Sequence, residues 1–436
     1  MNRHLYLSTI LFGVLMYAST VQGQFNNILL DDSITVYNPC EPSICINFQN
    51  PDNVVGGAIL DKVYITLDGG EKWLTQRLKS DYGVYGDPCL ISDFQGNIYY
   101  LHLSNTPSQG GWLDRIVCQH SSDGGVNWTD EGFMGHRNPK DQDKEWAVAD
   151  PHTGQLYATW TEFDAYSSKK EEDHSRILFS TSVDSGKTWS EPVSLSEKEG
   201  NCMDGDQTTE GAVPTIGPEG EIYVAWSYDE KIYFDKSLDQ GQTWLQNDIL
   251  IADQPGGWEY NMPGIMRCNG LPVTACDISQ GPHRGTIYVN WSDQRHGNKD
   301  TDIWLAKSTD GGETWSPPLR VNDDGEGKHQ FLTWMTVDPI TGYVYCVFYD
   351  RRAYKDNRTD VYLAYSIDGG GHFTNIKISE TPFLPNKNVF FGDYTNIAAY
   401  DGKIWPIWTR LENRKSSVWT SKILHSELES TQQQNR

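Results

Sequence analysis

The stretch TDGGETW at residues 309–315 decides the fold of this chain, because five variants of it occur elsewhere in the sequence. Every copy has an Asp, a Gly two positions later and an aromatic residue three positions after that Gly. The Asp positions are 68, 123, 184, 239, 310 and 368, so successive copies lie 55, 61, 55, 71 and 58 residues apart. A nearly constant period predicts one supersecondary unit per repeat. The other copies are LDGGEKW (67–73), SDGGVNW (122–128), VDSGKTW (183–189), LDQGQTW (238–244) and IDGGGHF (367–373).

Each recurring residue has a structural reason. An Asp side chain accepts hydrogen bonds from backbone amides a few residues further on and so closes a tight turn. The Gly supplies a positive φ that other residues resist, and the Trp or Phe fills the apolar gap between neighbouring sheets. The motif recurs once per unit and does not converge on one point, so we assign structural roles to Asp68, Asp123, Asp184, Asp239, Asp310 and Asp368.

The segments around each motif predict four strands per unit. In the second unit, residues 89–93, 97–101 and 115–119 are rich in β-branched and aromatic residues and precede the motif, and a short run follows it. Four antiparallel strands per period are typical of a propeller blade. After the last motif, residues 396–399, 403–408 and 417–423 supply only three strands, and Ser33–Tyr37 is free to add the fourth. We therefore predict an all-β, single β-propeller of seven blades, with six as the alternative.

Composition limits the classes of partner. The chain has 436 residues, 35 Lys and Arg against 59 Asp and Glu, and a net charge of −24, which disfavours nucleic acid. Residues 1–23 have the basic start, apolar run and small residues of a signal peptide, which predicts secretion to an extracellular or periplasmic location. No later apolar run reaches the roughly 20 residues of a membrane span. We expect a propeller domain over 24–427, a disordered tail over 428–436, and a monomer.

Eight cysteines follow the predicted signal peptide, and an even number in an exported chain allows disulfides. The neighbours Cys40 and Cys45, and Cys268 and Cys276, are the predicted pairs. Buried free thiols are the alternative.

The repeated motif resembles the Asp box, or bacterial neuraminidase repeat, of the sialidase-like superfamily. The resemblance implies a propeller fold, whereas its members include sialidases, other glycosidases, polysaccharide lyases and non-catalytic receptors. Sialidases resemble one another in a Phe/Tyr-Arg-Ile-Pro segment on the first blade, and use three Arg, an Asp acid and a Tyr paired with a Glu. The first unit here reads CEPSICIN at 40–47 and has no Arg, so the chain does not resemble a typical sialidase.

Propeller topology places the loops that enter each first strand on the same face as the loops between second and third strands. On that face, carboxylates suit a general acid and its partner in glycoside cleavage, and His or Tyr suits proton abstraction in a lyase. The candidate catalytic residues are Asp87, Glu145, Glu210, His136 and Tyr349.

Arginine and tryptophan side chains on the same face are candidates for substrate binding. Guanidinium groups grip carboxylate or sulfate bidentately, and an indole offers a flat face to a sugar ring. In the alternative reading, each Arg pairs with a neighbouring Asp and the Trp packs between blades. The candidates are Arg295, Arg351, Arg352, Arg410 and Trp291.

Two acidic loops offer the oxygen ligands that calcium prefers. The alternative is that these residues form turns and pair with Arg; no cofactor is otherwise required. The two sets are Asp293, Asp300 and Asp302, and Asp350, Asp356 and Asp360.

Together these observations predict a secreted carbohydrate-active enzyme, either a sialidase-like glycosidase or a propeller polysaccharide lyase, that acts on an acidic oligo- or polysaccharide. The alternative is a non-catalytic secreted propeller that binds a glycan or a protein.

Overall fold

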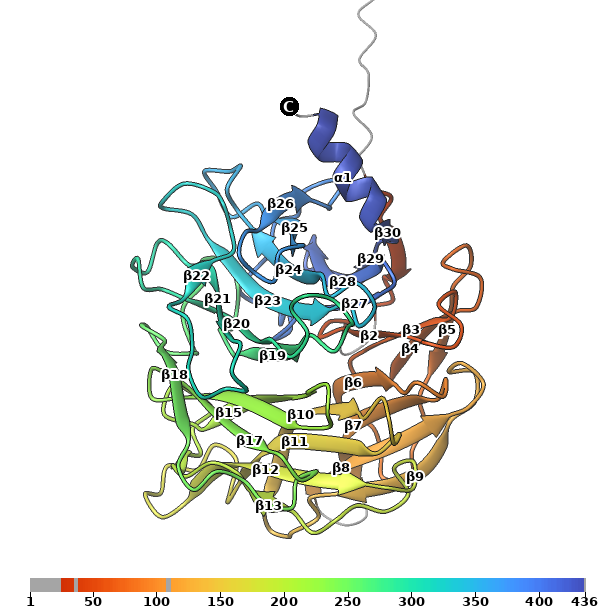
Figure 1. The fold of residues 1–436 in the computed structure, drawn as a ribbon, viewed down its shortest axis with the longest axis vertical. Coiled ribbons are helices and arrows are strands. Elements are labelled where there is room, and N and C mark those ends of the chain that lie inside the picture. Colours follow the sequence, from red (N-terminus) through yellow and green to blue (C-terminus); the bar gives the residue numbers. More distant parts are fainter. Residues whose placement is uncertain (1–24, 35–37, 107–110, 435–436) are drawn as a thin grey trace, which may run out of the picture.

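The computed structural model describes residues 25–34, 38–106 and 111–434, and it contains seven antiparallel sheets that follow one another around a ring (Figure 1). Each sheet is one blade, and the strand that enters it from the preceding blade lies innermost, where it contacts the equivalent strands of the neighbouring blades. The prediction of a seven-bladed all-β propeller is confirmed. The predicted signal peptide lies outside the described residues.

The first four blades are formed by consecutive strands. Their bounds are β2 (Ser43–Ile46), β3 (Val54–Ala58), β4 (Lys62–Thr66) and β5 (Leu74–Arg77) in blade 1; β6 (Gly86–Ser92), β7 (Ile98–Thr106), β8 (Gly111–Ser121) and β9 (Thr129–Met134) in blade 2; β10 (Asp141–Ala149), β11 (Leu156–Phe163), β12 (His174–Ser182), β13 (Val193–Ser194) and the short β14 (Gly200–Asn201) in blade 3; and β15 (Glu210–Ile216), β16 (Ile222–Tyr228), β17 (Lys231–Ser237) and β18 (Ile249–Asp253) in blade 4.

The remaining three blades complete the ring. Their bounds are β19 (Val273–Cys276), β20 (Ile287–Asp293), β21 (Asp302–Ser308) and β22 (Leu319–Arg320) in blade 5; β23 (Gln330–Val337), β24 (Val344–Asp350), β25 (Asp360–Ser366) and β26 (Thr374–Lys377) in blade 6; and β27 (Asn396–Tyr400), β28 (Lys403–Glu412), β29 (Lys415–Thr420), the short β30 (Ile423–Leu424) and β1 (Ile28–Asp31) in blade 7.

The amino-terminal strand β1 closes the ring by pairing antiparallel with β29. The sequence predicts this closure but assigns it to Ser33–Tyr37, and that assignment needs correction: the strand ends at Asp31, Ser33 and Ile34 lie outside any strand, and 35–37 are not described. Burial explains the choice. Leu30 packs among buried side chains of blades 1 and 7, whereas Ile34 is 65% exposed.

The repeated motifs form the turns between third and fourth strands, as predicted. In blade 3, Asp184 accepts hydrogen bonds from the Ser182 hydroxyl and from the Thr188 amide, both at 2.9 Å. The Gly186 amide in turn donates to the Ser182 oxygen at 2.9 Å. A Ser or Thr two residues before the Asp is therefore part of the motif, and the same pattern closes the other five turns.

The motif residues also join neighbouring blades. Gly241 in blade 4 has φ +84°, and a Cβ there would lie 2.4 Å from Cε1 of Phe179 in blade 3. The ring of Trp244 packs edge-on against the same Phe179, with centroids 4.9 Å apart. The Gly is thus needed for close approach between blades as well as for its backbone conformation.

All eight cysteines are buried free thiols, so the predicted disulfides Cys40–Cys45 and Cys268–Cys276 are not formed. Cys268 belongs to the largest apolar cluster, while Cys276 packs in a separate cluster between blades 4 and 5. Although Cys268 and Cys276 are close in sequence, their side chains lie in different apolar clusters and do not meet.

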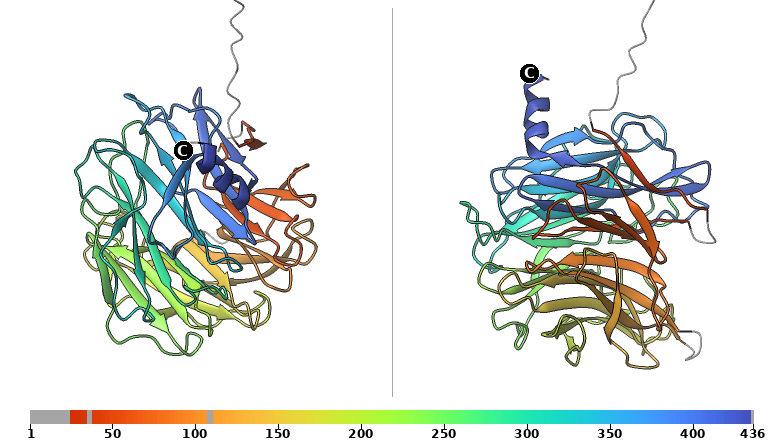
Figure 2. Two further views of the ribbon diagram at one scale, coloured as in Figure 1. Left: turned by 45° about the horizontal axis from the view of Figure 1, so that its top comes forward. Right: turned by 90° about the vertical axis from the view of Figure 1, so that its right-hand side faces the viewer.

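After β30 the chain forms one helix, α1 (His425–Gln434), beside blades 6 and 7, projecting from the ring (Figure 2). The sequence predicts a disordered tail from residue 428, whereas the structure has this helix through residue 434. Leu428 is fully buried and anchors it. No helix in the described ranges is long and apolar enough to cross a membrane.

Candidate functional site at the axial mouth

Irregular first strands turn charged side chains toward the propeller axis. The pairing of the first and second strands shifts between Gly86 and Cys89 in blade 2, and between Asp143 and Trp146 in blade 3. The residues within these bulges, Asp87 and Lys144, have φ of 49° and 56°. A bulge re-aims a side chain at the end of a strand, and here it directs both residues to one point.

At that point lies an ion-pair network that joins residues from several parts of the ring. Lys144 Nζ lies 2.8 Å from Asp393 Oδ2 and 3.6 Å from Asp87 Oδ2. Arg267 also binds Asp393, with Nε 2.9 Å from Oδ1, and its NH1 lies 2.8 Å from Asp204 Oδ2. We call these five residues the axial network. Residues from the first strands of blades 2 and 3 and from three interblade loops thus meet at one mouth.

Burial and charge act in opposite directions within the axial network. Burial alone would raise the pKa of Asp393, but Lys144 and Arg267 outweigh it and hold that pKa below its usual range. Burial would lower the pKa of Lys144, yet the carboxylates of Asp393, Asp87 and Asp143 raise it. The pairs therefore stay charged inside the mouth.

Other carboxyls around the network behave differently. Glu145 and Glu210 are fully buried, and neither carboxylate has a hydrogen-bond partner among the described residues. Burial raises the pKa of both side chains, and the nearby charges of Asp87 and Asp204, respectively, raise it further. Burial also raises the pKa of Asp143; Lys144 opposes this effect, and Asp87 and Asp204 add to it. These groups favour the protonated form that a general acid requires.

The outer side of the mouth carries aromatic rings. The Tyr166 hydroxyl donates to Asp204 Oδ2 at 2.5 Å, and the Tyr166 amide donates to Asp141 at 2.7 Å. The Trp112 ring, 46% exposed, packs edge-on against Tyr166 and Tyr85, with centroids 5.7 and 5.2 Å away. An exposed indole beside a polar cluster suits the apolar face of a sugar ring.

A long loop over residues 254–272, between blades 4 and 5, covers part of the mouth. It supplies Arg267, and its Asn269 side chain donates to the Asp393 carbonyl oxygen at 2.8 Å. Its Pro263 carbonyl accepts a hydrogen bond from Arg351 of blade 6 at 2.7 Å. The loop thus links the far side of the ring to the axial network.

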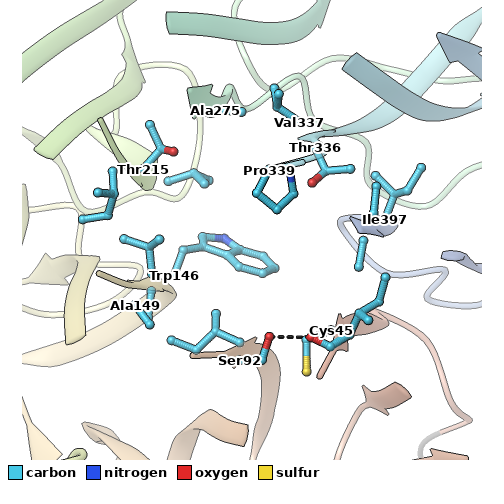
Figure 3. Close-up of a pocket in the computed structure, with 18 of the residues that line it drawn as sticks. Cys45, Ser92, Trp146, Ala149, Thr215, Ala275, Thr336, Val337, Pro339 and Ile397 are labelled. Carbon is cyan, nitrogen blue, oxygen red and sulfur yellow. Dashed lines mark hydrogen bonds between the residues drawn. The ribbon is translucent and has the colours of Figure 1, made fainter. Parts of the chain in front are cut away.

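Aromatic side chains separate the mouth from the channel below it. The rings of Trp146 and Trp334 lie 4.2 Å apart, and Tyr394 packs against both. Below them lies an axial cavity of about 250 Å³ with a mostly apolar lining, into which Trp146 projects (Figure 3). The charged chemistry is therefore confined to one end of the axis.

The predicted catalytic residues divide into two groups. Asp87, Glu145 and Glu210 lie at or beside the axial network, as their positions on first strands imply. His136 lies elsewhere, with Nε2 3.6 Å from Asp114. Tyr349 is fully buried and donates to the Thr409 carbonyl at 2.8 Å, which ties blade 6 to blade 7.

The predicted arginine cluster is not at the mouth. Arg295 pairs with Asp293 and Arg410 with Glu412. Arg352 pairs with its neighbour Asp350, and Arg351 donates to the Thr359 hydroxyl at 3.0 Å. Arg295 and Arg352 therefore follow the alternative interpretation of the sequence, in which each Arg pairs with a neighbouring Asp.

The predicted stacking residue Trp291 is fully buried, and its Nε1 donates to Asp293 at 2.8 Å. Its ring is therefore enclosed between blades and offers no face to a ligand. Equivalent tryptophans at the ends of other second strands, Trp160, Trp226 and Trp408, are buried in the same way.

Sequence reasoning did not select several residues of the mouth. Lys144 occupies the place in the bulge of β10 that the predicted residue Asp87 occupies in the bulge of β6, so alignment of the repeats offers a signal for it. Arg267, Tyr166 and Trp112 lie in loops or hairpins that differ from blade to blade, and the repeat offers no signal for those three.

In the structure, most of the predicted calcium ligands in the two acidic loops are bound to other side chains. Asp293 is held by Arg295 and Trp291, and Asp350 by Arg352. Asp356 pairs with Arg358 at the surface, and the Asp360 side chain accepts hydrogen bonds from Ser379 and Tyr354. Asp300 and Asp302 do lie close together, and His296 lies beside them. The ligand atoms of these three side chains lie within 4.8 Å of one another. Among the described residues, this is the only such group of three or more His, Cys, Asp or Glu.

Comparison with known proteins agrees with this architecture. The model of the BNR/Asp-box repeat family matches residues 306–317. The chain is a seven-bladed β-propeller that carries a BNR/Asp-box repeat, and its fold is similar to that of sialidases. No curated protein matches it in sequence.

Solved structures of this Asp-box propeller's fold include proteins named as enzymes of different kinds. An ulvan lyase bound to -[GlcA(1-4)Rha3S]- superposes with a TM-score of 0.53 at 12% identity, covering 92% of this chain and 96% of that one. The NanB sialidase from Streptococcus pneumoniae gives 0.51 at 10% identity, with 86% and 84% covered. An α-L-arabinanase from Penicillium chrysogenum gives 0.50 at 13% identity, with 78% and 93% covered. At these identities the likeness establishes the fold alone.

Proposed function

We propose that this Asp-box propeller is a secreted glycoside hydrolase that cleaves an acidic oligo- or polysaccharide at the axial mouth. The observation that carries the proposal is the hydrogen bond between Tyr166 and Asp204, next to a second carboxyl group, Asp143, whose pKa is raised by burial. Proteins of the same fold are named as a sialidase, an ulvan lyase and an arabinanase, which is consistent with a glycan substrate.

The two carboxyl groups suit different roles. Asp143, kept protonated by burial, is the candidate general acid that donates its proton to the departing glycosidic oxygen. Asp204 accepts the hydrogen bond from Tyr166, so it is placed to take the phenolic proton while that oxygen approaches the anomeric carbon. A carboxylate–tyrosine pair beside an acidic Asp resembles the arrangement that the sialidase family uses.

The same geometry disfavours a lyase in which Tyr166 removes the proton. Burial raises the pKa of Tyr166, and the charges of Asp204 and Asp143 raise it further. The free phenolate needed for abstraction from a uronate is therefore scarce at neutral pH. The predicted lyase candidates His136 and Tyr349 do not lie in the axial network.

Binding of an acidic sugar would rely on Arg267. Its side chain is 30% exposed, more than any other cation of the axial network, and it already holds two carboxylates. Trp112 and Tyr85 would support an adjacent ring by stacking. This single cation replaces the arginine cluster expected from the sequence.

The test is hydrolysis of a panel of acidic and neutral oligosaccharides by the purified protein, measured as reducing ends. Ultraviolet absorbance of unsaturated products tests for the lyase. We expect Asp143→Asn and Tyr166→Phe to lower kcat/KM by about 10²-fold or more, the usual scale for a general acid or base. Tyr354→Phe is the matched control, because the Tyr354 hydroxyl donates to Asp360 at 2.7 Å away from the mouth.

If no glycan is cleaved but an acidic oligosaccharide binds, the non-catalytic reading replaces the proposal. Equal loss of activity in Tyr354→Phe would show a general effect on folding rather than a role at the mouth.

A further inference from the structure

A second group of chemically competent side chains lies in the loop that joins β20 to β21 in blade 5. His296, Asp300 and Asp302 each offer one ligand atom, and these atoms lie within 4.8 Å of one another. None of the three belongs to the axial network, and neither the fold nor the proposed glycoside hydrolysis requires them. The group therefore calls for its own explanation.

Local backbone hydrogen bonds bring the three residues together. The Gly297 amide donates to the Gln294 carbonyl at 2.8 Å, and the Asp300 amide donates to the Gly297 carbonyl at 2.9 Å. Gly297 has φ +109°, and no atom lies within 4 Å of the place where its Cβ would be. The two turns fold the loop back so that His296 faces the start of β21, where Asp302 is the first residue.

The donor atoms are close and differ in exposure. His296 Nδ1 lies 2.8 Å from Asp302 Oδ2, and the His296 side chain is 44% exposed. Asp300 and Asp302 are both buried. An ion held by this group would be fixed on its inner side by two carboxylates and would face solvent on the side of the imidazole.

The negative charge of the two aspartates is incompletely balanced. Asp302 Oδ1 accepts a hydrogen bond from Asn322 at 2.7 Å and lies 3.4 Å from Arg320. Within the described part of the chain, the side chain of Asp300 accepts only the Lys328 amide, at 3.2 Å. A divalent cation would stabilise both carboxylates in their charged form.

We propose that His296, Asp300 and Asp302 form a zinc-binding site with three protein ligands and an open position toward solvent. One imidazole nitrogen and two carboxylate oxygens are ligands that Zn²⁺ accepts, and three protein ligands plus water is a common zinc coordination. Ca²⁺ and Mg²⁺ prefer oxygen ligands alone, and imidazole favours zinc and its neighbours among the transition metals.

The same chain provides a matched comparison for a histidine that only pairs with an aspartate. His372 Nδ1 lies 2.7 Å from Asp368 Oδ2 in the last Asp-box turn, where no second carboxylate of the described ranges completes a group of three. A simple His–Asp hydrogen bond is thus present at both places. Only the group in blade 5 adds the third ligand.

The experiment is titration of the chelator-treated full chain with Zn²⁺ by calorimetry, repeated with Ca²⁺. We expect one Zn²⁺ per chain, with binding at least tenfold weaker in His296→Ala and in Asp300→Asn, and unchanged in His372→Ala. Co²⁺ in place of Zn²⁺ should give visible absorption that His296→Ala removes. Circular dichroism and the melting temperature identify any variant that fails to fold, and the exposed His296 makes that variant the decisive one.

Absence of Zn²⁺ binding would overturn the proposal. So would binding that persists in His296→Ala, binding that falls equally in His372→Ala, or tighter binding of Ca²⁺ than of Zn²⁺. None of these results depends on whether the chain cleaves a glycan.

Discussion

Replacement of Glu210 by Gln should stabilise the protein at neutral pH, although it changes a fully buried residue beside the axial network. Within the described part of the chain the Glu210 carboxylate has no hydrogen-bond partner. Burial, followed by the charges of Asp204 and Asp143, raises its pKa well above the usual value. Gln keeps the shape and cannot ionise. Its amide nitrogen can donate to the nearby carboxyl groups.

The sign of the effect follows from proton linkage. In the unfolded chain a Glu loses its proton near pH 4.3, whereas Glu210 in the folded protein retains it to higher pH. Between these two values the unfolded state gains stability as the pH rises, at about 1.4 kcal/mol per pH unit for one group. Over the pH range in which folded Glu210 keeps its proton, the wild type should therefore lose stability at this slope, and Glu210→Gln should not.

The assay is urea unfolding of wild type and Glu210→Gln at pH 5, 6, 7 and 8. The free energy of unfolding of the variant should fall less steeply with pH than that of wild type, by a difference in slope that corresponds to about one bound proton. At pH 7 the variant should be more stable than wild type. With an unfolding entropy of about 2.1 cal/mol/K per residue, each kcal/mol gained by the variant corresponds to about 1 °C in melting temperature. The exposed Glu326 supplies the control Glu326→Gln, which should leave the slope unchanged. Identical slopes in wild type and Glu210→Gln, or a variant less stable at pH 7, would refute the reasoning.

Three further outcomes are expected. Asp184→Ala should lower the free energy of unfolding by about 0.5–2 kcal/mol, the range for a lost cap, and leave glycan binding intact; loss of binding at an unchanged melting temperature would contradict the structural role. Reducing agent should leave the melting temperature unchanged, and a thiol reagent should react quickly only in denaturant, because all eight cysteines are buried and free; a drop in melting temperature on reduction would reveal a disulfide. Arg267→Ala should weaken binding of an acidic oligosaccharide about tenfold or more, the scale of one charge-assisted hydrogen bond, whereas Arg295→Ala should not. The measurement is titration calorimetry. A larger loss of affinity in Arg295→Ala than in Arg267→Ala would place the binding site at the blade-5 loop.

The limits of sequence reasoning differ between the turns and the mouth. The Asp-box turns were predictable because Ser182, Asp184, Gly186 and Thr188 bond within seven residues of one another, so their pattern is visible in a short window. For the predicted arginines, the repeat left two possibilities open, a shared binding cluster or pairing with a neighbouring Asp. Arg295, for example, binds Asp293 two residues away.

The sequence predicts that an amino-terminal strand closes the ring, but it does not show which residues form that strand. Seven units with one strand missing require a donor strand, because an open sheet edge is unfavourable. Which short apolar run supplies it depends on the surface it meets. Leu30 finds a buried place between blades 7 and 1, whereas Ile34 points into solvent.

The sequence by itself determined the propeller fold and the turn chemistry and favoured seven blades, because these features rest on local hydrogen bonds and on a period that the chain repeats. Only the tertiary structure decided that Asp87, Lys144, Asp204, Arg267 and Asp393 meet at the axis. Lys144 and Asp393 are separated by 249 residues, and the bulge at the start of β10 directs the lysine side chain toward the axis. Contacts of that kind depend on how the blades close into a ring, which no local pattern encodes.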